Sequence, residues 1–80
     1  MSERDPRISP IHGDIVRVPT GDMRERHCLG VQYNDWVGYF AVRKTSTVEC
    51  HCSLRAWQIW CAHHAVEIVQ RAEDLYGTRT

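Results

Sequence analysis

Three observations predict a mainly β fold, a small and strongly curved barrel of about five strands with one short helix before the last strand. Short apolar runs recur along the chain at intervals of about 8–12 residues. Glycines interrupt two of these runs, at Gly30 and Gly38, and glycine inside a strand is typical of a bend or bulge. The segment from Val48 to Cys61 changes from a strand period to a helix period.

Length, charge and cysteine content limit the function classes. The chain has 80 residues, near the size at which one hydrophobic core becomes marginal, so we expect a single domain. Its 10 basic and 10 acidic side chains cancel, which removes the overall field that draws a protein onto nucleic acid. The start is polar and no apolar run nears the roughly 20 residues of a membrane span. We therefore expect a soluble, cytoplasmic protein whose four cysteines are reduced thiols.

The strands are predicted from alternation and from turn residues. Residues 1–10 hold two prolines and mixed charge, so we expect a flexible lead. Gly13-Asp14 predicts a turn before the first strand, and Asn34-Asp35 predicts the turn of a hairpin. Leu29, Val31 and Tyr33 alternate, which predicts that they share one face. The expected strands are residues 15–18, 27–33, 36–42, 48–52 and 65–69.

The segment VECHCSLRAWQIWC, residues 48–61, organises the rest of the chain. In its first half Val48, Cys50 and Cys52 alternate with polar residues, as in a strand with one buried face. Ser53 is a good helix N-cap. In the helix that follows, one face carries Leu54, Trp57, Cys61 and His64, with Trp60 at its edge. Ile59 falls on the outward face, which indicates a contact outside the core.

Two interpretations remain for the end of the chain. Residues 65–69, AVEIV, are β-branched enough for a fifth strand. Alternatively, one helix extends from Ser53 to Tyr76, because Leu54, Cys61 and Ile68 keep roughly heptad spacing. The hydrogen bonds of Val66 and Ile68 decide between them. Residues 70–80 are polar, and we expect a tail with one helical turn at residues 72–76.

The motifs GDIVRV, VQY and CSLRAWQIWCAHHAVEIV carry a resemblance. They are similar to the small SH3-like, or KOW-like, barrels encoded by phages and mobile elements, which have a GD-x-V start and a C-x-L-x-x-aromatic-x-x-W helix before the closing strand. The resemblance covers about residues 11–69. It implies an SH3-like barrel and nucleic-acid binding. This chain departs from the pattern in its extra cysteines and histidines and in its balanced charge.

The cysteines and histidines raise two chemical alternatives. Cys50, Cys52, Cys61 and His63 form a permitted zinc ligand set. The C-x-C spacing on a strand separates the two sulfurs, so we favour buried thiols and expect no metal or other cofactor. Adjacent Cys and His residues on a strand point to opposite faces, which disfavours a cysteine nucleophile. We therefore expect no enzymatic activity.

Surface recognition is the remaining class of function. Arg24 and Arg26 enter the second strand and Arg43 and Lys44 leave the third, so an antiparallel hairpin brings them together as a basic edge. The aromatic residues near the other end of this hairpin are either docking anchors or caps on the core. The residues expected to bind a partner are Arg24, Arg26, Arg43, Lys44, Trp36, Tyr39, Ile59 and Trp60.

Two functions follow as hypotheses. The first is a phage-type protein that binds and inhibits a host protein or nucleoprotein complex, since the chain resembles small anti-CRISPR inhibitors in size and charge balance. The second is a nucleic-acid-binding KOW-like module that uses the basic edge. We also expect a homodimer through Ile59 and Trp60, because a domain of 80 residues gains from burying apolar area that it cannot enclose alone.

Overall fold

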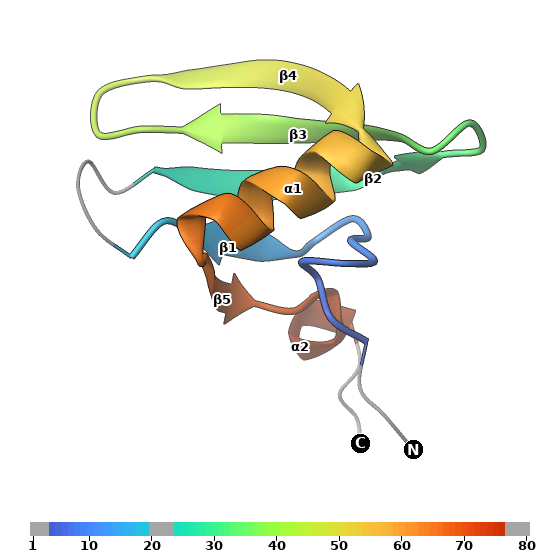
Figure 1. Cartoon of the computed structure of the whole chain (residues 1–80). Helices are drawn as coiled ribbons and strands as arrows, with labels where there is room; N and C mark the ends of the chain where they lie inside the picture. Colours follow the sequence, from blue (N-terminus) through green and yellow to red (C-terminus); the bar gives the residue numbers. More distant parts are fainter. Residues whose placement is uncertain (1–3, 20–23, 77–80) are drawn as a thin grey trace.

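The strands form one antiparallel sheet. The computed structural model describes residues 4–19 and 24–76 (Figure 1). The elements are β1 (Ile15–Arg17), β2 (Glu25–Gln32), β3 (Trp36–Val42), β4 (Thr47–Ser53), α1 (Leu54–His64), β5 (Glu67–Gln70) and α2 (Ala72–Tyr76). The sheet has the order β4-β3-β2-β1-β5. This confirms the mainly β class and the helix before the last strand. Because β4 and β5 stand at the two ends of this order, closure into a barrel stays a prediction.

The β2–β3 hairpin turns where the sequence predicts it, but a bulge changes its faces. Asp35 has φ 58°, and its N–H donates to the Gln32 carbonyl at 2.9 Å. The register shifts between Cys28 and Gly30, so Leu29 lies beside Gly38, whereas Val31 pairs with the buried Val37. Val37 and Gly38 are successive strand residues on opposite faces. The prediction that Leu29 and Val31 share a face is therefore wrong.

Helix α1 begins and ends through local hydrogen bonds. The Ser53 hydroxyl accepts from the Ala56 N–H at 3.0 Å, which confirms the predicted N-cap. Ala65 adopts a left-handed conformation at the other end, with φ 48°, and the Val66 N–H donates to the Cys61 carbonyl. The chain then pairs Ile68 with Val16 of β1. The fifth strand is thus confirmed, and the single long helix is wrong.

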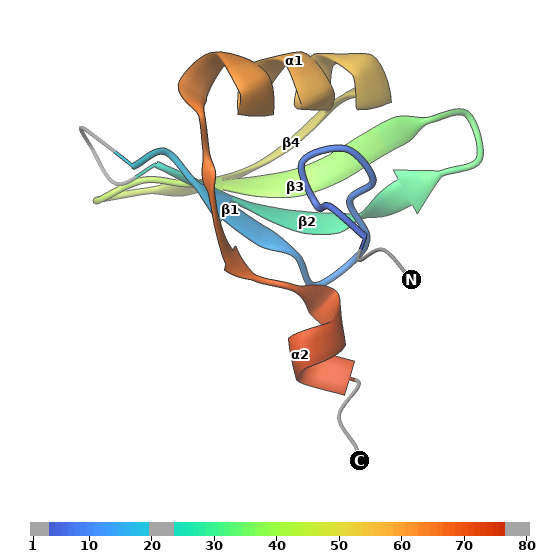
Figure 2. The same ribbon diagram turned by 60° about the horizontal axis from the view of Figure 1, so that its bottom comes forward.

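The hydrophobic core lies between α1 and the sheet. Figures 1 and 2 show α1 across one face, which we call the inner face; the opposite face is the outer face. Trp57 is fully buried, and its ring and that of Tyr39 form a T-shaped pair with centroids 5.6 Å apart. The core comprises Val16, Val18, Cys28, Val37, Tyr39, Trp57, Cys61 and Val66. Cys50 and Cys52 pack against it, whereas Val48 at the start of β4 is exposed.

Residues 4–10 differ from the expected flexible lead, because they pack against α1. The Trp57 indole N–H donates to the Pro6 carbonyl at 3.0 Å. The Gln58 amide donates to the Ile8 carbonyl at 2.9 Å. Pro6 and Pro10 are buried. A buried indole N–H needs an acceptor, and the lead supplies it, so residues 4–10 belong to the folded domain.

Asp14 joins three parts of the chain. Its carboxylate is 0% exposed and accepts from the Arg4 guanidinium at 2.6 and 2.7 Å. It also accepts from the Ile11 N–H at 2.7 Å and from the Ala72 N–H at 2.8 Å. Arg4 in turn pairs with Glu73 of α2 at 2.6 Å. The hydrogen bonds to Asp14 and Glu73 raise the pKa of Arg4. The short helix predicted at residues 72–76 is confirmed, and Asp14 fixes its first residue to β1.

The Asp14→Asn variant should lower the free energy of unfolding by about 3 kcal/mol, because it breaks a buried ion pair and turns an amide toward the donors. Urea denaturation followed by tryptophan fluorescence measures this. The control is Asp5→Asn, which removes the partly exposed Asp5–Arg7 pair and should cost about 1 kcal/mol or less. Equal losses in the two variants would contradict the role of Asp14.

Candidate functional site

Three arginines and a tryptophan gather at one end of α1. The antiparallel register pairs Glu25 with Val42 and Arg26 with Ala41, so the start of β2 lies beside the end of β3. The hollow between them and α1 has a volume of about 60 Å³ and is lined by Arg24, Glu25, Arg26, Ala41, Val42, Arg43 and Trp60. We call Arg24, Arg26, Arg43 and Trp60 the arginine-tryptophan cluster. The predicted meeting of the two strand ends is confirmed.

Arg26 is held between two aromatic rings. Its guanidinium carbon lies 3.8 Å from the centroid of Trp60 and 4.4 Å from that of Tyr39. Contacts of this geometry are favourable, and more so where water is partly excluded. Arg26 is only half-buried, so the charge stays close to solvent while the side chain is fixed. The structure thus places the Arg26 guanidinium over the rings of Tyr39 and Trp60 and not on an open edge of the sheet.

Two histidines extend the cluster along the last turn of α1. The His64 ring lies 5.2 Å from Trp60 and 4.8 Å from His63, measured between centroids. Desolvation lowers the pKa of His64, and the nearby His63, Arg24 and Arg26 lower it further. The lowered pKa favours the neutral form of His64, whereas the arginines of the cluster stay charged.

Among the described residues, no neighbour neutralises the charge of the cluster. Glu25 lines the hollow, but its carboxylate pairs with Arg17 at 3.6 Å and with His27 at 2.8 Å. Within residues 4–19 and 24–76, no acidic side chain forms an ion pair with the arginines of the cluster. A chain with balanced charge therefore has a local positive surface at this end.

The other predicted site residues are distributed over different surfaces. Lys44 is exposed in the turn after β3, outside the hollow. Tyr39 is buried, so it caps the core and is not a docking anchor. Trp36 is 42% exposed and alternates with the buried Val37, which places it on the outer face. Ile59 is 56% exposed on α1, as predicted.

The four cysteines are free thiols. Burial raises the pKa of Cys28 to about 11 and that of Cys61 to about 12. Burial also raises the pKa of Cys52, although the nearby Arg26 lowers it. Protonated thiols are poor nucleophiles and poor metal ligands. Among the described residues, no group of three or more His, Cys, Asp or Glu side chains is placed to hold a metal ion.

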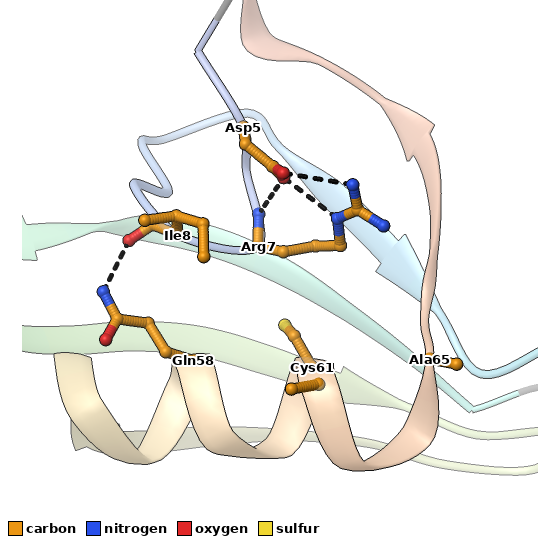
Figure 3. A pocket seen from close by; sticks show the side chains of 7 residues that line it. Asp5, Arg7, Ile8, Gln58, Cys61 and Ala65 are labelled. Carbon is orange, nitrogen blue, oxygen red and sulfur yellow. Dashed lines mark hydrogen bonds and ion pairs between the residues drawn. The ribbon is translucent and has the colours of Figure 1, made fainter.

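Another hollow, which we call the lead hollow, lies between the lead and α1 (Figure 3). Its volume is about 300 Å³, and it is lined by Asp5, Arg7, Ile8, Gln58, Cys61, Ala62 and Ala65. Arg7 donates to the Asp5 carboxylate at 3.0 Å, and the Cys61 sulfur points toward the lead in Figure 3. Sequence reasoning missed this hollow because it treated the lead as flexible. The available signal was Trp57, whose indole N–H needed a buried acceptor.

Comparison with known proteins provides no relative from which the role of these surfaces can be inferred. No family model, curated protein or solved structure matches this chain. In the part of the chain that the structure describes, no helix is long and apolar enough to cross a membrane.

Thiol labelling of the folded protein at pH 8 should leave Cys28 and Cys61 unmodified, because both are buried and hold their protons. Cys50 and Cys52, which are half-buried, should react first. Brief iodoacetamide treatment followed by peptide mass spectrometry measures this, with urea-unfolded protein as the control in which all four react. Early labelling of Cys61 would contradict its position in the core.

Proposed function

We propose that this chain is a non-enzymatic binding protein that docks on a host protein or nucleoprotein complex and inhibits it, as the resemblance to phage-encoded inhibitors implies. The observation that carries the proposal is the arginine-tryptophan cluster. Its three arginines lack acidic partners among the described residues, and its central arginine is already fixed by stacking. An anionic surface on the partner supplies the missing acceptors.

The geometry favours binding over chemistry. An arginine that is ordered before binding loses less side-chain entropy on forming hydrogen bonds with phosphate or carboxylate. Arginine and tryptophan are also the residues that most often carry the binding energy of an interface. The thiols, which are the strongest nucleophiles of the chain, have raised pKa values at three positions. These features support a recognition surface of limited area.

The test replaces Arg24, Arg26 and Arg43 by glutamine and uses the purified protein to capture partners from a lysate of the host. The wild-type protein should retain a complex that the triple variant loses, because each arginine at a desolvated contact contributes about 1–3 kcal/mol. Arg55→Gln, on the exposed face of α1, is the control and should retain the complex. Capture of the same complex by the triple variant would contradict the proposal.

A second candidate function, a module that binds free nucleic acid, is favoured by the juxtaposition of three arginines with Trp60. Fluorescence anisotropy with a labelled single-stranded 20-mer separates the two functions. Neutralisation of about three phosphates predicts that log K falls with log salt with a slope of about −2. Binding of the free strand with this slope would favour the second function. Absence of binding, together with capture of the complex, would favour the first.

The exposed Ile59 gives a separate prediction about association. Ile59→Asp should leave the fold intact, since the side chain makes no core contact. It should weaken a homodimer or the partner complex by more than about 1 kcal/mol, because a charge replaces an apolar contact. Size-exclusion chromatography and partner capture measure the two effects, and Val48→Asp, which replaces an equally exposed apolar residue of β4, is the matched control. Unchanged elution and unchanged capture would exclude this face of α1 from the interface.

A further inference from the structure

We propose that the outer face of the sheet is a docking groove for an extended protein segment that carries an apolar side chain and, two or three residues away, a lysine or arginine. This site goes beyond the proposed function, because it lies on the face of the sheet opposite to α1. Two adjoining hollows that share Leu29 form the groove.

The first hollow is apolar and lies toward α2. Its volume is about 240 Å³. Ile15 of β1, Leu29 of β2, Phe40 of β3 and Leu75 of α2 line it, with His12, His27 and Gln70 among the polar residues of its wall. Phe40 is 37% exposed, so an apolar side chain placed here would cover surface that the chain itself leaves open to water.

The second hollow has a floor of bare backbone and an acidic wall. Its volume is about 340 Å³, and it is lined by Leu29, Gly30, Val31, Gln32, Gly38, Glu49 and His51. Gly30 and Gly38 pair directly across the strands, so no side chain stands between β2 and β3 at this point. The nearest side chain to Gly38 is the His51 ring, 3.4 Å from the position of a Cβ.

The charge of the second hollow selects the partner. The carboxylate of Glu49 is 58% exposed and lies 4.0 Å from the His51 ring nitrogen, a separation too long for a close ion pair. It is the acidic group that lines this hollow. A lysine or arginine reaching over the glycine floor would lay its aliphatic stem along Leu29 and place its charge beside Glu49.

The spacing of the hollows fits an extended chain. Gly38 and Phe40 are alternate residues of β3 on the outer face, and alternate residues of a strand are about 7 Å apart. Side chains two positions apart on an extended partner segment have the same separation. One segment can therefore fill both hollows, with the apolar residue over Phe40 and the basic residue over Gly38. From there the long basic side chain extends toward Glu49, which pairs with Phe40 across β3 and β4.

The experiment selects a displayed library of random 12-residue peptides against the immobilised full chain. Enriched peptides should share an aliphatic or aromatic residue two or three positions from a lysine or arginine. The Glu49→Arg protein should instead enrich acidic residues at the second position, because it reverses the charge of the hollow. Glu67→Arg, another exposed strand glutamate outside both hollows, should enrich the same basic peptides as the wild type.

A synthetic peptide with the enriched sequence then tests the groove directly. Its affinity should fall at least about tenfold in Glu49→Arg and in Gly38→Val, which fills the floor. It should be unchanged in Glu67→Arg and in the triple glutamine variant of the arginine-tryptophan cluster. Failure to enrich any peptide, enrichment without a basic residue, or equal affinity for the Glu49→Arg protein would overturn the proposal. Loss of binding in the triple variant would also overturn it, since it would place the peptide on the other surface.

Discussion

One buried carboxylate, Asp14, fixes the ends of the chain to the sheet. It receives two hydrogen bonds from Arg4 in the lead, and one each from the backbone of Ile11 and Ala72. A buried carboxylate without such partners would be strongly unfavourable, so the lead and α2 are held together with β1. The lead then supplies the Pro6 carbonyl that accepts from Trp57, and α2 brings Leu75 to the outer-face groove.

The two faces of the sheet have different chemistry. Helix α1 covers the inner face (Figure 2), and at its end the arginine-tryptophan cluster leaves a fixed positive surface. The outer face carries Trp36, Phe40 and a glycine floor beside Glu49. Since the balanced net charge conceals this division, composition alone indicates neither surface.

Local rules predicted the elements well, because their causes lie within a few residues. Asn34-Asp35 gave the hairpin turn, Ser53 gave the start of α1, and the β-branched run after Ala65 gave β5. The bulge after Cys28 was not predicted, since alternation alone does not locate an extra residue. The site was predicted in part. The register brought Arg24, Arg26 and Arg43 together, but long-range packing decided that Tyr39 is buried and that residues 4–10 dock on α1.

The central claim is that Asp14 ties the lead and α2 to the sheet as one unit, and hydrogen exchange tests it most directly. In the wild-type protein, the Ala72 amide and the Trp57 indole N–H should both exchange slowly, as measured by NMR. Arg4→Ala should accelerate both and leave the amides of the β2–β3 ladder protected, because that ladder does not depend on Asp14. Rapid exchange of the Ala72 amide in the wild type, or slow exchange of both groups in Arg4→Ala, would contradict the account.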